Sequence, residues 1–136
     1  MLRIILLLLL FSPAVAADSL DRGDFVGEWR SNWPTTEGEV NVLTISNNLE
    51  STFTRKFSNE YPEQSYDAPP KLFNIVDDIA IIEFWDDTPA LRYKLVLSGW
   101  KSQSTRRLFG TMYMYRDGKL FNGLPISLEG ERQGAS

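Results

Sequence analysis

Carboxylate side chains are the first candidates for chemistry in this sequence, because it contains neither histidine nor cysteine. Their absence excludes a Ser-His-Asp or Cys-His nucleophile, zinc bound by either residue type, and thiol redox chemistry. Acidic residues do gather around one strand-like run: Asp77, Asp78, Glu83, Asp86 and Asp87. Opposed carboxylates hydrolyse glycosidic bonds in most glycosidases, and clustered carboxylates bind Ca²⁺.

The placement of these carboxylates argues against an enzyme. Both aspartate pairs fall where turns are expected, and aspartate is common in turns. The intervening strand of about seven residues separates the pairs by about 23 Å, so one active site cannot use both. Neither a G-x-x-x-x-G-K-[ST] nor a G-x-G-x-x-G phosphate loop is present. We therefore predict a protein that is not an enzyme and has no metal or cofactor.

Aromatic side chains are the stronger candidates for a binding site. The chain contains 8 Phe, 5 Tyr and 4 Trp, and ligand pockets are mostly apolar with a few polar anchors. We predict that a ligand contacts Trp29, Trp85, Tyr93, Tyr113 and Arg107. The arginine begins a strand and is suited to a carboxylate or phosphate group. The alternative for the aromatic residues is a place in the core of a protein without disulfides.

The segments that contain these residues are predicted to be β-strands. From Leu49 to Phe57, apolar and polar residues alternate, which is the period of a half-buried strand. The expected strands are Phe25–Arg30, Val40–Ser46, Leu49–Phe57, Leu72–Val76, Ile79–Trp85, Leu91–Trp100, Leu108–Tyr115 and Lys119–Leu128. The range Ser58–Lys71 contains three prolines and is expected to be a long loop.

Short turn signals join most of these runs. Asn47-Asn48, Asp77-Asp78 and Asp117-Gly118 are typical of two-residue hairpin turns. Strands joined in this way pair with their neighbours in antiparallel fashion. We predict an all-β protein: a single antiparallel meander of about eight strands, closed into a barrel that removes the sheet edges. An open sandwich is the alternative.

The segment Phe25-Val26-Gly27-Glu28-Trp29 adds a family resemblance. A G-x-W pattern on the first strand of a meander resembles the calycin superfamily of lipocalins, fatty-acid-binding proteins and avidins. The resemblance implies a barrel whose floor is closed by Trp29. It also implies that a cation from the last strands, Arg116 or Lys119, packs over the indole.

The first residues are typical of a secretory signal peptide. An arginine at position 3 precedes the apolar run Ile4–Phe11, and Ala14-Val15-Ala16 is a cleavage signal. Eight apolar residues span about 12 Å as a helix, against roughly 30 Å of bilayer hydrocarbon. We expect cleavage after Ala16 or Ala17, a single domain over residues 17–136, and a secreted or periplasmic location.

These observations predict an exported binding protein that holds a small apolar or aromatic ligand inside a barrel. The alternative is a surface interaction module or inhibitor that binds a protein or glycan through Ser58–Lys71 or Trp33–Gly38. The net charge of −4 does not suit nucleic acid or an anionic membrane surface. An outer-membrane barrel is disfavoured, because the strands do not present an unbroken apolar outer band.

Overall fold

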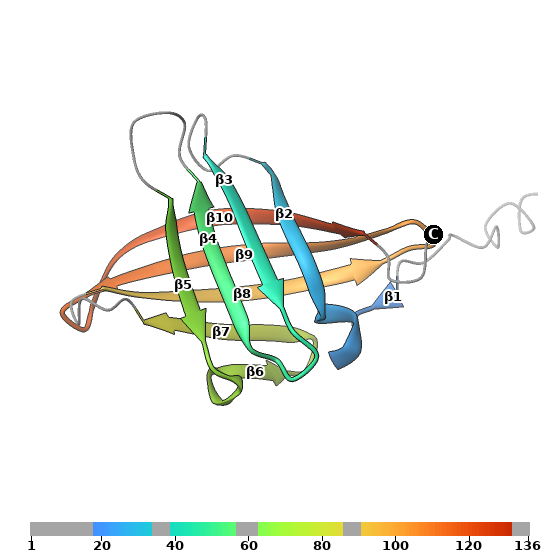
Figure 1. Ribbon diagram of the computed structural model, residues 1–136, viewed down its shortest axis with the longest axis horizontal. Helices are drawn as coiled ribbons and strands as arrows, with labels where there is room; N and C mark the ends of the chain where they lie inside the picture. The colour runs from blue at the N-terminus through green and yellow to red at the C-terminus, as the bar shows by residue number, and fades with distance from the viewer. Residues whose placement is uncertain (1–17, 34–38, 57–62, 86–90, 132–136) are drawn as a thin grey trace, which may run out of the picture.

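The computed structural model of this chain describes residues 18–33, 39–56, 63–85 and 91–131, and the predicted signal peptide lies outside these ranges (Figure 1). The described chain is all-β, which confirms the predicted class. Its strands are β1 (Asp18–Ser19), β2 (Gly27–Trp33), β3 (Val40–Ile45), β4 (Ser51–Lys56), β5 (Gln64–Ala68), β6 (Phe73–Val76), β7 (Ile79–Trp85), β8 (Leu91–Lys101), β9 (Thr105–Arg116) and β10 (Lys119–Glu131). Two 3₁₀ helices accompany them, η1 (Arg22–Phe25) and η2 (Pro70–Leu72). No helix in these ranges is both long and apolar enough to cross a bilayer.

The strands form one antiparallel sheet, as predicted. Their order is β5-β4-β3-β2-β10-β9-β8-β7-β6, and β1 pairs with the end of β8. The long strand β2 therefore lies beside the final strand β10, so the meander returns to its start. No ladder joins β5 to β6, and the sheet is not closed there. The predicted closure into a barrel is thus not confirmed.

Of two predicted hairpin turns, one has the conformation expected from its residue types and the other does not. Asp117 and Gly118 have φ values of 50° and 77°, as a turn of type I′ requires. At the β3–β4 turn the left-handed residue is Leu49, with φ 67°, and neither asparagine is left-handed. The amide of Leu49 donates to the Ser46 carbonyl at 2.9 Å, which makes a longer loop than predicted. Burial of the leucine side chain opposes the cost of this conformation, about 1–2 kcal/mol.

The prediction of one loop over Ser58–Lys71 was wrong in its second half. Strand β5 lies within that range and helix η2 begins in it, whereas residues 58–62 lie outside the described residues. Strand β5 pairs only with β4 and forms one edge of the sheet. It ends just before Pro69 and Pro70, which have no amide hydrogen for a ladder. The prolines therefore limit the length of the strand without preventing it.

Close approach of the backbone at two glycines accompanies the strong curvature of the sheet. A Cβ atom on Gly99 would lie 2.2 Å from the Arg107 carbonyl oxygen, and one on Gly110 would lie 1.9 Å from that of Val96. Glycines at such positions allow long strands to coil. As a result, β2–β5 cross over β7–β10 (Figure 1). Ring pairs join the two halves, with centroids 5.8 Å apart for Phe53 and Phe84.

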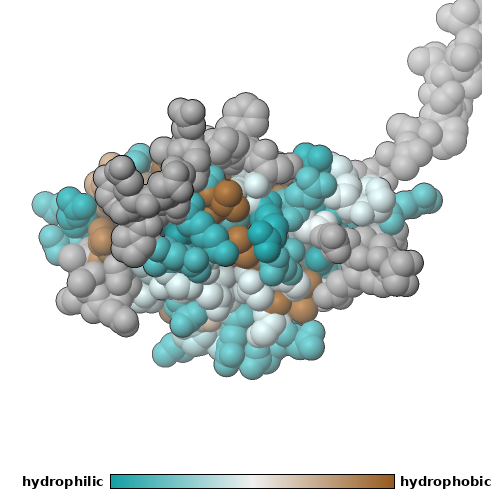
Figure 2. All heavy atoms as spheres, turned by 45° about the horizontal axis from the view of Figure 1, so that its top comes forward, coloured by the Kyte–Doolittle hydropathy of each residue, from teal (hydrophilic) through white to brown (hydrophobic). Residues whose placement is uncertain are grey.

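The space between the two halves is filled by side chains. The largest that are fully buried are Trp29, Phe25, Phe53, Phe84, Leu43, Ile45, Ile82, Leu95, Leu97, Leu108, Met112 and Leu128. Hydrophilic residues cover most of the described surface seen in Figure 2, and the hydrophobic ones form small separate patches there. The core is therefore continuous through the middle of the curled sheet, and candidate sites lie at its ends or outside it.

Candidate functional site

At one end of the core, Trp29 is fully buried and closely packed. Its indole Nε1 donates to the Phe25 carbonyl at 2.9 Å. The Arg106 guanidinium lies 4.5 Å from the ring centroid and donates to the carbonyls of Val26 and Asp24. Gly130 lies opposite Trp29 in the β2–β10 ladder, and a Cβ there would be only 2.8 Å from the indole. These contacts make Trp29 part of the packed end of the sheet.

The predicted identity of the cation over Trp29 was wrong. Arg116 lies over the Phe121 ring at 4.9 Å, and Lys119 pairs with Arg116 beside the β9–β10 turn. The register explains the difference, because the residue opposite Gly130 on β9 is Arg106. Burial lowers the pKa of Arg106, and the charge of Asp24 acts in the opposite direction.

A second group of residues, all facing inward except the exposed Gln64, lies toward the opposite end of β3 and β4, and we call it the interior polar cluster. Its members are Glu39, Asn41, Arg55, Gln64, Tyr66 and Tyr93. Strand alternation brings them inside: Asn41 follows the same phase as Leu43, and Arg55 the same phase as Phe53. Asn41 and Arg55 are direct partners across the β3–β4 ladder. Four elements therefore deliver polar groups to one region of the interior.

A buried ion pair organises the interior polar cluster. The Arg55 Nε atom lies 2.7 Å from Glu39 Oε1, with side chains only 12% and 1% exposed. Burial acts to lower the pKa of Arg55, but the hydrogen bond and charge of Glu39 outweigh it and raise that pKa. The ion pair as a unit contributes no net charge to the cluster.

Two tyrosines form the other wall of the interior polar cluster. Their ring centroids are 4.6 Å apart, and the Tyr66 hydroxyl lies 3.3 Å from that of Tyr93. The Tyr66 hydroxyl also donates to Gln64 Oε1 at 2.7 Å. Because Gln64 is exposed, the hydrogen-bonded chain runs from solvent to the interior.

Three atoms of the interior polar cluster are buried without a hydrogen-bond partner among the described residues. They are Glu39 Oε2, Asn41 Nδ2 and Asn41 Oδ1. Leaving such a group unpaired costs about 1–3 kcal/mol, and folded proteins rarely tolerate it. The cluster therefore contains an acceptor at Glu39 and both a donor and an acceptor at Asn41 that no described residue satisfies.

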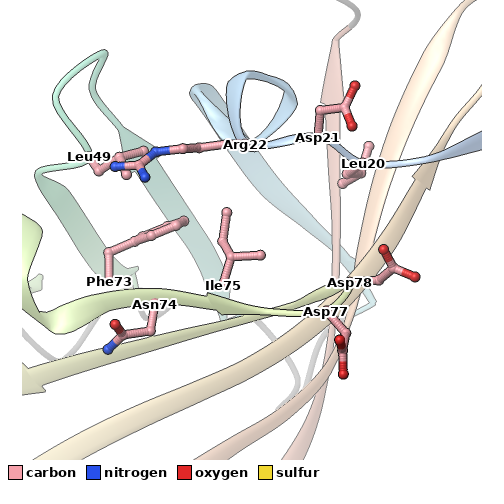
Figure 3. Close-up of a pocket in the computed structure, with 9 residues that line it drawn as sticks. All are labelled: Leu20, Asp21, Arg22, Leu49, Phe73, Asn74, Ile75, Asp77 and Asp78. Atoms are coloured by element: carbon pink, nitrogen blue, oxygen red, sulfur yellow. The ribbon is translucent and has the colours of Figure 1, made fainter.

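A cleft of about 420 Å³, which we call the seam cleft, lies beside the edge strand β6, which pairs with β7 on its other side (Figure 3). It is lined by Leu20, Asp21, Arg22, Leu49, Phe73, Asn74, Ile75, Asp77 and Asp78. Phe73 and Ile75 project into it below Leu49 and Arg22, whereas the carboxylates of Asp77 and Asp78 point away (Figure 3). The seam cleft thus has walls of mixed polar and apolar residues, and its polar groups do not converge on one point.

The remaining predicted ligand residues lie on the outer face of the sheet. Trp85 is 52% exposed, and Tyr113 faces outward from β9. Arg107 lies 5.9 Å from the Trp100 ring and 3.8 Å from Glu129. The structure therefore does not bring the five predicted residues together: Trp29 is in the packed core, Tyr93 is in the interior polar cluster, and the others lie outside.

The residues that sequence reasoning missed are Glu39, Asn41 and Arg55. Charged and amide side chains are mostly exposed in folded proteins, so their residue types alone do not indicate an interior site. The sequence signal that could have found Asn41 and Arg55 is strand alternation, because each lies two residues from an apolar neighbour that faces inward. Asp77 and Asp78 lie in the predicted turn, and Asp86 and Asp87 fall outside the described residues. No group of three acidic residues in the described ranges is placed to hold a metal ion.

Comparisons with models of protein families, with curated proteins and with solved structures gave no match to this chain.

Proposed function

We propose that this protein is an exported, non-enzymatic binding protein that holds a small ligand at the interior polar cluster. The observation that carries the proposal is Asn41, which is fully buried although neither atom of its amide has a partner among the described residues. A protein gains nothing in stability from this arrangement. A ligand that completes the hydrogen bonds of the Asn41 amide accounts for an asparagine at this buried position.

The chemistry of the cluster defines the ligand class. The Arg55–Glu39 pair is neutral overall, so a neutral ligand suits it better than an ion. Glu39 Oε2 accepts a hydrogen bond, and the Asn41 amide both donates and accepts. Tyr66 and Tyr93 offer ring surface beside these groups. A small flat molecule with adjacent donors and acceptors matches this set, whereas a purely apolar ligand leaves the polar atoms unpaired.

The proposal includes closure of the sheet into a calycin-like barrel. The pairing of β2 with β10 and the packing of Arg106 on Trp29 support it. In this view the Trp29 end is the floor and the interior polar cluster lies toward the mouth. The open seam between β5 and β6 is where closure must occur.

Export is the other part of the proposal, and it rests on residues 1–16. Expression of the full chain in a bacterial host, followed by separation of the periplasm, tests it. We expect a periplasmic protein whose N-terminal residue is Ala17 or Asp18. An uncleaved chain retained in the cytoplasm would refute export without affecting the binding site.

Native mass spectrometry of the gently purified protein tests the binding site. We expect an additional mass, lost in Asn41→Leu and kept in Asn74→Leu. The second substitution is a matched control, because Asn74 is an exposed residue on β6. As an independent arm, nicotinamide and benzamide serve as probes in an NMR titration of the tyrosine resonances. Absence of both a bound mass and any shift at Tyr66 or Tyr93 would sink the proposal.

A further inference from the structure

The outer face of the sheet carries a layered arrangement of rings and a cation, which we call the outer aromatic patch. Trp85 on β7 is opposite Arg92 on β8, and Arg92 is opposite Tyr115 on β9. The guanidinium carbon of Arg92 lies 5.4 Å from the Trp85 ring centroid and 4.6 Å from that of Tyr115. The cation on β8 is thus held between two aromatic rings, one from the strand on either side of it.

Arg92 differs from the other outward cations of this face in its partners. Lys94 lies opposite Glu83 in the β7–β8 ladder, and Arg107 lies 3.8 Å from Glu129. No acidic side chain in the described ranges pairs with Arg92, and its Nε atom is buried without a hydrogen-bond partner. The flanking rings fix the plane of the guanidinium but supply no negative charge. Among the described residues, the complement that Arg92 lacks is an anion.

We propose that the outer aromatic patch binds an acidic polysaccharide. A carboxylate of the sugar chain pairs with the Arg92 guanidinium, whose fork of donors matches a carboxylate. The apolar faces of neighbouring sugar rings stack on Trp85 and Tyr115. These two side chains stand two strands apart, about 9.6 Å, so they contact successive parts of an extended chain.

The combination of rings and charge selects this class of partner. A neutral glycan uses the rings but leaves Arg92 without its anion, and an acidic peptide uses Arg92 but does not need two exposed rings. The patch lies outside the sheet, whereas the interior polar cluster faces inward. This inference is therefore independent of the proposed interior ligand.

Affinity electrophoresis of the folded protein tests the proposal with three probes. Polygalacturonate carries both sugar rings and carboxylates, dextran carries rings alone, and poly-L-glutamate carries carboxylates alone. We expect retardation by polygalacturonate, weakened by added salt because the charge contact is exposed. We expect little retardation by the other two polymers.

Matched variants locate the site. Arg92→Gln removes the charge-assisted contact and Trp85→Ala removes one stacking ring, and each is expected to weaken binding about tenfold, equivalent to about 1.4 kcal/mol. The controls are Arg116→Gln and Phe121→Ala, which remove a second exposed cation–ring pair with a separation of 4.9 Å. These controls are expected to bind like the unaltered protein, and circular dichroism melting checks that all four variants fold.

Three results would overturn the proposal. Equal retardation by poly-L-glutamate would assign the face to acidic proteins, and equal retardation by dextran would remove the role of Arg92. Unchanged binding of polygalacturonate by both Arg92→Gln and Trp85→Ala would place the contact elsewhere. A further variant, Arg92→Lys, keeps the positive charge but lacks the planar guanidinium. It is expected to bind polygalacturonate more tightly than Arg92→Gln and less tightly than the unaltered protein.

Discussion

Replacement of Asn41 by leucine is expected to stabilise this protein, although the residue lies in its interior. Asn41 is fully buried, and both polar atoms of its amide lack a partner among the described residues. The side chains of asparagine and leucine have similar length, so the substitution fills the same space. The backbone amide of residue 41 keeps its hydrogen bond to Ser31 Oγ at 2.9 Å, because that bond does not involve the side chain.

The expected gain follows from the two unpaired atoms. Each costs about 1–3 kcal/mol in the folded state, so removing both at the lower limit raises the free energy of unfolding by about 2 kcal/mol. For a domain of this size, that gain raises Tm by about 8 °C. Urea unfolding followed by tryptophan fluorescence measures the first quantity, and calorimetry measures the second. The ligand-free protein must be used, because a bound ligand stabilises the unaltered chain.

An exposed asparagine on β6 provides the control for this prediction. Asn74→Leu places the same replacement on an exposed strand position and is expected to change stability by no more than about 0.5 kcal/mol. A loss of stability in ligand-free Asn41→Leu would show that the Asn41 amide makes favourable contacts. The argument that the amide is kept for a ligand would then fail.

Three further predictions concern the Trp29 end of the molecule. Arg106→Leu is expected to destabilise the protein by about 3 kcal/mol in urea unfolding, because it removes the cation from Trp29 and leaves two carbonyls without their donor; an unchanged unfolding curve would contradict this. Gly130→Ala is expected to lower the free energy of unfolding by about 1–3 kcal/mol, because its Cβ would lie 2.8 Å from the Trp29 indole. The control is Gly23→Ala, whose Cβ would meet no atom within 4 Å and which is expected to leave stability unchanged. Burial raises the pKa of Asp24, but the hydrogen bond from Lys101, the Asp21 amide and nearby positive charges outweigh burial and lower that pKa below 3.8. The resulting stabilisation is present above pH 3.8 and is lost as the pH falls through the lower pKa that Asp24 has in the folded protein. Lys101→Met is therefore expected to reduce the loss of stability at acid pH, measured by unfolding at a series of pH values. The same acid dependence in both proteins would refute the role of this pair.

The sequence predicted the all-β class and antiparallel order well, because alternation and turn chemistry are local. The type I′ turn at Asp117 and Gly118 is such a case. The left-handed Leu49 was not predictable from the same rules, because burial of its side chain in the core decides its conformation. The edge strand β5 was missed because the prolines of Ser58–Lys71 exclude a central strand and favour a loop, whereas an edge strand can end at a proline.

The candidate site was harder to predict, because outward and inward faces cannot be distinguished when both are apolar. Strand β9 alternates Met112 and Met114 with Tyr113 and Tyr115, and only the structure shows that the methionines face inward. The interior polar cluster needs residues from four distant elements, whose register is set by the whole sheet. The partner of Trp29 depends on the same long-range register, which places Arg106 rather than Arg116 beside Gly130.

The pairing of β2 with β10 has a consequence for when this molecule can fold. Trp29 on β2 aligns with Gly130 on β10, so these two strands pair only after the whole intervening chain has been made. Pairings between such distant segments form late and slowly. A chain still emerging from the ribosome lacks the strand that completes its most buried end, and it therefore stays open until synthesis is complete. An open chain is also what a translocation channel for unfolded polypeptides accepts.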